Sequence, residues 1–246
     1  MKGTVASLCG TAVSAARMST LPARAVGLAS AMFVLAMAAA PTTRPAAPDA
    51  DREGLVQCAN LTYARHRSSV CFSDRFLRKI AAETSIRTED RFRPVRLDAD
   101  DFYNYPFAIM TGEGRFELTE TERRNLKSYL ERGGFLLASA GCSNSDWNRA
   151  FRDELNRIFP ERRLKKLEMS HPVFHTVYDI GQLKMKRPTK AQLEGLEIDG
   201  KLVLIYSEQG LNDTANAGKG CCCCGGNEIL NAESVNVNIL TYALTH

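Results

Sequence analysis

The chain has 246 residues, 44% of them hydrophobic, with 32 basic and 28 acidic side chains and a formal net charge of +4. Three of the basic residues and none of the acidic ones lie in residues 1–38, so removing that segment from the 32 leaves 29 basic against 28 acidic residues. This near balance argues against nucleic acid as a partner, because nucleic-acid binding draws on a clear excess of positive charge.

Residues 1–40 have the layout of a secretory signal peptide. Arg24 precedes an apolar, alanine-rich run with small residues suited to cleavage near Ala38. The run is shorter than the ~20 residues that a membrane-spanning helix needs, and no later segment is long and apolar enough to span a membrane. We therefore expect cleavage and export, to the bacterial periplasm or cell envelope; an uncleaved anchor is the alternative. A start at Met18 instead of Met1 would give a more ordinary leader.

The rest of the chain divides into a linker and one domain. Residues 41–54 are rich in proline and alanine and cannot form a hydrophobic core. Residues 55–246 are numerous enough to bury a proper interior, so we predict a single domain there.

Strand-like and helix-like segments alternate along this domain. Apolar runs predict strands at 55–63, 94–97, 105–110 and 135–140, and a hairpin at 196–206 around the Asp199-Gly200 turn. Helical spacing of apolar residues predicts helices at about 73–83, 119–132, 144–158 and 227–244. The order of these elements predicts an α/β fold of three layers, with a mostly parallel sheet and helices on both faces.

The ends of two predicted helices carry recognisable signals. Thr119-Glu-Thr-Glu122 is a capping box, and Gly133-Gly134 ends the helix that it opens. Asn144 or Ser145 caps the next helix, which stops at Pro160.

Several segments together resemble a known family. They are Gly133-Gly134-Phe135, Phe159-Pro160 and His171-Pro-Val-Phe-His175. From about Leu55 to His246 the chain is similar to the domain-of-unknown-function family 4159, as an exported member. The resemblance implies a fold like that of the class I glutamine amidotransferases and flavodoxins, and it implies no activity, because the family has no established one. The acidic residues that follow the Gly-Gly-Phe strand in the family pattern are replaced here by Ala138-Ser-Ala-Gly-Cys142.

Residues able to do chemistry follow the predicted strands. Ligands bind at the carboxyl ends of the strands in such sheets, so we expect these residues to gather along one edge. The cysteines among them are Cys71, Cys142, Cys221, Cys222, Cys223 and Cys224. Candidate ligand-binding residues near the same edge are Glu113, Ser143, Trp147 and Glu208. The alternative for Glu113 is that its two flanking glycines simply form a turn. The alternative for Trp147 is that it is a core residue.

Cys142 has the position of a nucleophile, between a buried strand and the start of a helix, where the helix N-terminus favours a thiolate. A nucleophile needs a base, and His171 and His175 are the candidates. In the amidotransferase-like enzymes that the chain resembles, the equivalent turn carries the catalytic cysteine, usually between glycines; here Ser143 follows. The alternative is that Cys142 fills a buried corner. The spacing of four residues would bring both imidazoles to one metal ion only if the segment were a helix. Pro172 argues against a helix there.

The four consecutive cysteines at 221–224 allow three interpretations. They could hold a metal such as zinc, although adjacent residues rarely point at one centre. They could form disulfides, which are natural in an exported protein, with Cys71 or Cys142 as a partner. They could also be a tight structural loop. The seven cysteines that remain after leader removal are an odd number, so one thiol stays free or pairs between chains if the others all pair.

The chain has no complete set of nucleophile, base and orienting group. We therefore predict an exported, non-catalytic module that binds an unknown protein or small-molecule ligand, with no nucleic acid and no membrane span after cleavage. One alternative is a cysteine-dependent hydrolase or amidotransferase-like enzyme that uses Cys142 with a histidine. The other is a thiolate metal or redox site at Cys221–Cys224.

Overall fold

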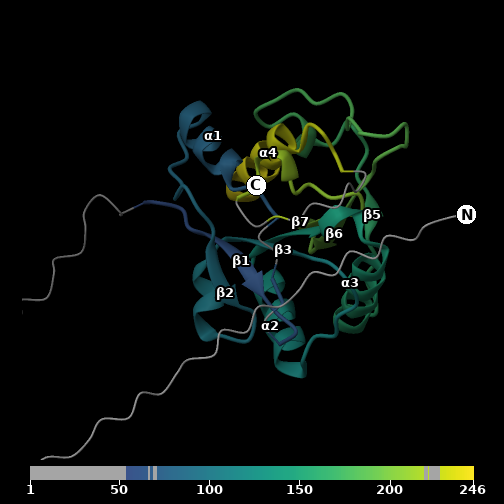
Figure 1. Ribbon diagram of the computed structural model, residues 1–246. Coiled ribbons are helices and arrows are strands. Elements are labelled where there is room, and N and C mark those ends of the chain that lie inside the picture. Colours follow the sequence, from purple (N-terminus) through teal and green to yellow (C-terminus); the bar gives the residue numbers. More distant parts are fainter. Residues whose placement is uncertain (1–53, 66, 69–70, 219–220, 222–227) are drawn as a thin grey trace, which may run out of the picture. The chain divides into compact units, whose positions relative to one another are not determined.

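The computed structural model describes residues 54–65, 67–68, 71–218, 221 and 228–246 (Figure 1). The predicted signal peptide and all of the linker except Gly54 lie outside these residues. Within the part of the chain described, no helix is both long enough and apolar enough to cross a bilayer.

The described residues form one seven-stranded sheet, in the order β2-β1-β3-β4-β7-β6-β5. The strands are β1 (Cys58–Thr62), β2 (Arg93–Arg96), β3 (Phe107–Gly112), β4 (Phe135–Ala140), β5 (Lys165–Lys166), β6 (Leu193–Ile198) and β7 (Lys201–Ser207). Pairing is parallel from β2 through β7, whereas β6 runs antiparallel to β7 and to β5. The sheet is therefore mostly parallel, as predicted.

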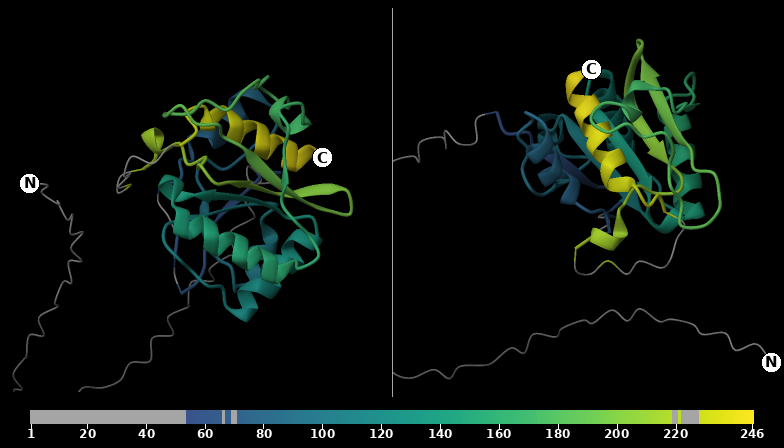
Figure 2. Two further views of the ribbon diagram at one scale, coloured as in Figure 1. Left: turned by 90° about the vertical axis from the view of Figure 1, so that its right-hand side faces the viewer. Right: turned by 90° about the horizontal axis from the view of Figure 1, so that it is seen from above.

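Two helices cover each face of the sheet, which confirms the three-layer α/β arrangement (Figure 2). Helices α1 (Arg75–Glu83) and α4 (Ala232–Thr245) pack together on one face, and α2 (Glu120–Glu131) and α3 (Ser145–Ile158) on the other. Side chains alternate across a strand, so β3 sends Ala108 and Met110 into the core under α2 and α3 and Phe107 and Ile109 into the core under α4. This double burial explains its continuous apolar sequence.

The predicted helix ends are largely those of the structure. The hydroxyl of Thr119 accepts a hydrogen bond from the backbone N–H of Glu122, and the Glu122 carboxylate accepts one from the N–H of Thr119, which completes the capping box. Asn144 caps α3 by accepting from the N–H of Trp147 at 2.9 Å. Helix α1 begins at Arg75, with Asp74 as its N-cap, two residues after the predicted start at about 73.

Helix α4 begins at Ala232, later than the predicted start near residue 227. The backbone before it is used by other loops: the N–H of Ile229 donates to the carbonyl of Gly210 at 3.2 Å, and the N–H of Leu230 donates to the carbonyl of Lys184 at 2.7 Å. These long-range bonds replace the bonds that a first helical turn would make, and a local pattern of apolar residues carries no signal for them.

Candidate functional site

The loops after β1, β3, β4 and β7 meet at the carboxyl edge of the parallel strands. The hydroxyl of Ser143 donates to the carbonyl of Gln209 at 2.7 Å, which joins the β4 loop to the β7 loop. The side-chain oxygen of Asn144 accepts from the N–H of Gly114 at 3.0 Å, which joins the β4 loop to the β3 loop. The edge is thus a set of loops held together by side-chain to backbone hydrogen bonds.

A disulfide between Cys71 and Cys221 joins the β1 loop to the segment before α4. The two Cα atoms lie 4.7 Å apart, and the bridge spans 150 positions of sequence. Cys222, Cys223 and Cys224 lie outside the described residues, so their pairing or zinc binding stays a prediction. Among the described residues, no cluster of three or more His, Cys, Asp or Glu side chains is arranged to hold a metal ion.

Cys142 occupies the tight turn between β4 and α3 in a left-handed conformation, with φ 50° and ψ 32°. The turn leaves no room at Gly141, where a Cβ would lie 2.9 Å from the carbonyl oxygen of Gly112. The carboxylate of Glu228 accepts a hydrogen bond from the backbone of Cys142, and burial raises the pKa of Glu228. The hydroxyl of Thr214 also donates to this carboxylate, at 2.6 Å.

The structure does not bring His171 to Cys142. The His171 ring lies against Tyr242, with the ring centroids 5.6 Å apart. Tyr242 in turn lines a small cavity with Phe135 and Lys201, the first residues of β4 and β7, so it sits at the amino edge of the parallel strands. Cys142 follows the carboxyl end of β4. The two predicted partners therefore lie at opposite edges of the sheet.

His175 has both ring nitrogens engaged on the surface. Its Nδ1 lies 2.6 Å from a carboxylate oxygen of Asp179, and its Nε2 lies 2.7 Å from the carbonyl oxygen of Met169. These hydrogen bonds raise the pKa of His175, the bond to Met169 contributing most. The segment around it follows the outer side of α4, since the N–H groups of Val177 and Tyr178 donate to Asn238 in that helix.

Three of the candidate ligand-binding residues, Glu113, Ser143 and Glu208, lie on the neighbouring loops of the carboxyl edge, whereas Trp147 lies in the core. Trp147 is completely buried, and its indole Nε1 donates to the hydroxyl of Tyr63 at 2.7 Å, so it is a core residue. Glu113 is exposed, and Ser143 is partly buried in its bond to the β7 loop. Glu208 is exposed and pairs loosely with Arg152 at 3.6 Å.

Buried polar side chains beneath the edge are used to hold the loop that follows β7. The hydroxyl of Ser139 accepts from the N–H of Leu211 at 2.8 Å and donates to the side chain of Asn212. The Asn212 amide donates to the hydroxyl of Thr111 at 3.1 Å, and Asn236 donates to the carbonyl of Leu211 at 2.8 Å. These four polar side chains are fully buried, so they position the loop and offer no surface to a ligand.

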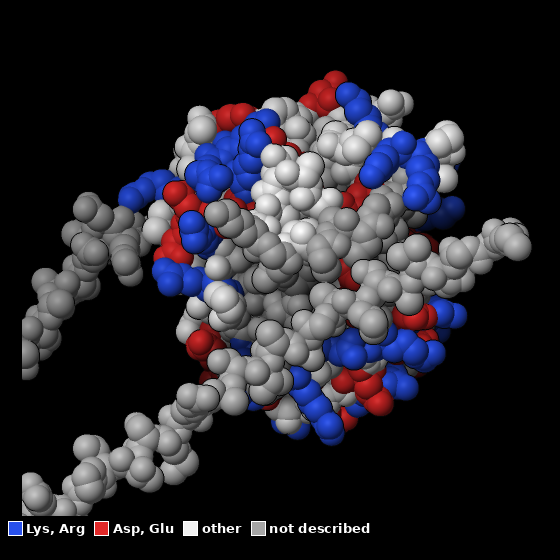
Figure 3. Space-filling model, viewed as in Figure 1, with Lys and Arg blue, Asp and Glu red and all other residues white. Residues whose placement is uncertain are grey.

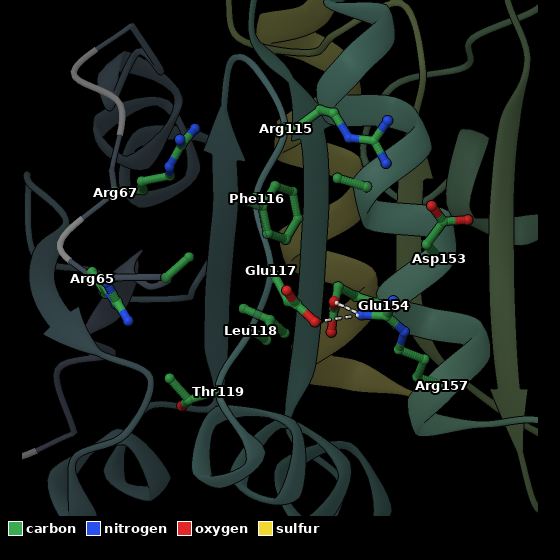
Figure 4. Close-up of a pocket in the computed structure, with 12 residues that line it drawn as sticks. Arg65, Arg67, Arg115, Phe116, Glu117, Leu118, Thr119, Asp153, Glu154 and Arg157 are labelled. Atoms are coloured by element: carbon green, nitrogen blue, oxygen red, sulfur yellow. Dashed lines mark hydrogen bonds and ion pairs between the residues drawn. The ribbon is translucent and has the colours of Figure 1, made fainter.

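An open cavity of about 550 Å³ lies beside this edge, on the face covered by α2 and α3, and sequence reasoning missed it. We call it the arginine pocket. It is lined by Ala64, Arg65, Arg67, Arg115, Phe116, Glu117, Leu118, Thr119, Ala150, Asp153, Glu154 and Arg157. Figure 4 shows Arg65 and Arg67 on one wall, the segment 115–119 along the middle, and Asp153, Glu154 and Arg157 from α3 on the opposite wall.

The two carboxylates that line the pocket near α3, Glu117 and Glu154, are paired with arginines. Buried Glu154 accepts from Arg123 at 2.7 Å and from Arg157 at 2.7 Å. Glu117 accepts from the same two arginines, at 3.3 and 3.1 Å. A buried carboxylate needs such partners, because an unpaired charge there would be costly. The network therefore fixes this wall and leaves little free charge on it.

Three further lining arginines pair with no described acidic side chain: Arg65 and Arg67 on the wall opposite α3, and Arg115 at the start of the segment 115–119. Arg65 and Arg115 are exposed, and Arg67 makes one bond, from Nη1 to the carbonyl of Glu113 at 3.2 Å. A Cβ added at Gly114 would lie 3.6 Å from that same Nη1, so the Arg67 guanidinium lies next to the residue that precedes Arg115.

The turn that carries Arg65 and Arg67 is held in an uncommon conformation. Ala64 and Arg65 have φ angles of 45° and 61°, a left-handed conformation that few non-glycine residues adopt. Tyr63 and Arg67 exchange backbone hydrogen bonds of 2.9 and 2.7 Å across the turn, and the N–H of Ala64 donates to buried Glu122 at 2.7 Å. Such strain persists where the surroundings fix it, and it clusters at functional sites.

Figure 3 shows one face of the molecule. Outside the grey atoms, both blue and red side chains occur on it, with blue ones grouped at the upper left and upper right. The arginine pocket is a local feature that net charge does not reveal. The Arg65-His66-Arg67 triplet was visible in the sequence, but the other lining residues, at 115–119 and on α3, lie 48 or more positions further along the chain.

Comparison with protein families adds to this geometry. A family model described as a domain of unknown function, DUF4159, matches residues 59–244. The chain belongs to the DUF4159 family. The match includes the seven strands described above, apart from the first residue of β1, and the four α-helices, apart from the last residue of α4. It therefore covers the arginine pocket and the Cys142 turn together. None of the curated proteins compared with this DUF4159 chain is significantly similar to it.

Proposed function

We propose that this DUF4159 domain is a non-catalytic module that binds a small-molecule ligand in the arginine pocket. The observation that carries the proposal is the pocket itself: about 550 Å³ of open space beside the carboxyl edge, lined by arginines that no described acid neutralises. Pockets of this size are large enough for small-molecule ligands.

The non-catalytic part of the proposal is supported by the arrangement of the predicted catalytic residues. Cys142 and His171 lie at opposite edges of the sheet, and the ring of His175 is engaged by Asp179 and Met169. A nucleophile and its base must lie within hydrogen-bond reach to act together. His171 does not fulfil that condition here, and both ring nitrogens of His175 are already engaged.

We also propose that the domain acts after export. The leader-like segment at 1–40 supports this, as does the Cys71–Cys221 disulfide, because disulfides form and persist in oxidising compartments. Expression in a bacterium with N-terminal sequencing of the processed protein tests it. We expect a mature chain that begins near residue 41 and is recovered from the periplasmic fraction; an unprocessed cytoplasmic chain would contradict export.

Binding can be tested with a small panel of probes that differ in charge: glucose, choline, inorganic phosphate and citrate. We expect isothermal titration calorimetry to detect saturable binding of at least one probe to the purified chain. Asp153→Trp places a large side chain at the pocket mouth and should abolish that binding. Asn156→Trp is the matched control, because Asn156 is exposed on the same helix and does not line the pocket.

Two outcomes would contradict the proposed function. If every probe that binds has the same affinity for Asp153→Trp as for the control variant, the ligand binds outside the pocket. Chemical conversion of a bound probe that disappears in Cys142→Ala would show a cysteine-dependent enzyme. We expect the bound probe to be recovered unchanged and Cys142→Ala to keep the affinity.

A further inference from the structure

We infer that the ligand of the arginine pocket presents a multiply charged oxyanion, a phosphate group or clustered carboxylates, to Arg65, Arg67 and Arg115. This inference rests on the proposed function, since it names the class of ligand that the same pocket takes. Phosphate and carboxylate share the chemistry that matters here, which is a set of acceptor oxygens with delocalised negative charge.

The charges of the pocket favour an anion. The carboxylates of Glu117 and Glu154 are each shared between two arginines, Arg123 and Arg157. They therefore contribute little repulsion toward a second anion. Among the described lining residues, Asp153 is the one acid without an ion pair; Figure 4 shows it on α3, across the pocket from Arg65 and Arg67.

The donors of Arg67 are partly committed and partly available. A guanidinium has five N–H donors in a rigid fork and no acceptor. The bond from Nη1 to the carbonyl of Glu113 uses one donor and anchors the side chain beside Gly114. The remaining donors match the planar or tetrahedral oxygens of a carboxylate or phosphate, which arginine binds in bidentate fashion.

The backbone beneath these arginines is prearranged. The left-handed turn at Ala64 and Arg65 is fixed by Glu122, whose other oxygen caps α2 at Thr119. An exposed arginine on a plain surface needs no such support. A rigid backbone lowers the entropy that binding must remove from the site, and so raises affinity for a ligand that fits.

The experiment compares inorganic phosphate with citrate on the full chain by isothermal titration calorimetry. Arg67→Gln and Arg115→Gln should each weaken binding about tenfold, the range expected when a charge-assisted hydrogen bond is lost. Arg124→Gln is the matched control, since Arg124 is an exposed arginine on α2 outside the pocket; its affinity should equal that of the unaltered chain. Binding should also weaken between about 0.01 and 0.15 M salt, as the screening length falls from about 30 Å to about 8 Å.

The outcomes separate this inference from the proposed function. Tighter binding of phosphate than of citrate identifies a phosphate-bearing ligand, and the reverse identifies a polycarboxylate; both support the inference. If glucose or choline binds, is lost in Asp153→Trp and is unaffected in the Arg67→Gln/Arg115→Gln double variant, the oxyanion inference is overturned while the pocket stands. If phosphate and citrate bind no better to the unaltered chain than to the double variant, the oxyanion inference is overturned as well.

Discussion

The indole Nε1 of Trp147 donates a hydrogen bond of 2.7 Å to the hydroxyl of Tyr63, and both side chains are almost completely buried. Tyr63 precedes the left-handed turn at Ala64, and Trp147 lies one turn before Ala150 in α3. The bond therefore links the two walls of the arginine pocket beneath its floor. The same hydroxyl donates to the backbone carbonyl of Thr111 at 3.1 Å, so it also ties in the end of β3.

Tyr63→Phe should destabilise the domain by about 1–3 kcal/mol, because it leaves the buried indole N–H and the Thr111 carbonyl without this partner. Urea unfolding of the purified chain measures the change. Tyr105→Phe is the control, on a partly exposed tyrosine with no hydroxyl bond assigned, and should change stability by less than about 0.5 kcal/mol. Equal stabilities of the two variants would show that the buried bond contributes nothing.

Reducing the Cys71–Cys221 bridge should cost about 2–5 kcal/mol, the usual range for a native disulfide that closes a long loop. Thermal unfolding with and without a phosphine reductant measures this cost. Cys71→Ala should be as unstable as the reduced chain and should not respond to the reductant. Cys58→Ala is the contrasting variant: Cys58 is a free, buried thiol whose pKa burial raises to about 12, so this variant should still respond. An unaltered chain that is insensitive to reductant would contradict the bridge.

Gly210→Ala should lower stability by about 1–3 kcal/mol or more, because the residue has a φ of 95° and its Cβ would lie 2.6 Å from the carbonyl oxygen of Ala140. The contact would push the β7 loop away from the Cys142 turn. Gly181→Ala is the control, since nothing lies within 4 Å of its Cβ position, and it should change stability by no more than about 0.5 kcal/mol. Denaturant midpoints of the two variants provide the comparison.

Stability should fall as the pH rises through the titration range of Glu228. Burial raises the pKa of this carboxyl in the folded state, so between its ordinary value, about 4.3, and the raised value the folded chain binds more protons than the unfolded chain. The stability contribution is therefore complete below the ordinary pKa and is lost as pH rises through the raised one. Glu228→Gln should flatten this decline in unfolding free energies measured from pH 4 to 8; an unchanged slope would contradict it. Burial also raises the pKa of Asp213, so part of the loss of stability with rising pH should persist in Glu228→Gln.

Much of the architecture was readable from the chain because it depends on local chemistry. The capping box at Thr119, the Asn144 cap and the buried strand Phe135–Ala140 all involve residues close together in sequence. The mostly parallel sheet follows from the alternation of strands and helices along the chain. The meeting of the loops at one edge is then a consequence of parallel strands ending together.

The candidate catalytic pair shows where such reasoning stops. Nothing local distinguishes a His171 that reaches Cys142 from one that packs on Tyr242, because the direction of the segment 171–184 is set by its hydrogen bonds to Asn238 and to the loop before α4. The predicted start of α4 near residue 227 was wrong for the same reason, because the backbone before Ala232 makes hydrogen bonds to distant loops.

The amino-acid sequence was sufficient for the fold class, the capped starts of α2 and α3 and the family, since periodicity and capping act within a few residues. The arginine pocket required the folded chain. It is lined from three separate segments: by Ala64, Arg65 and Arg67, by residues 115–119, and by residues of α3 from Ala150 to Arg157. Packing of α3 against the end of β1, through Trp147 and Tyr63, brings these segments together around one cavity. Which of the described arginines remain unpaired depends on ion pairs formed between segments far apart in the chain.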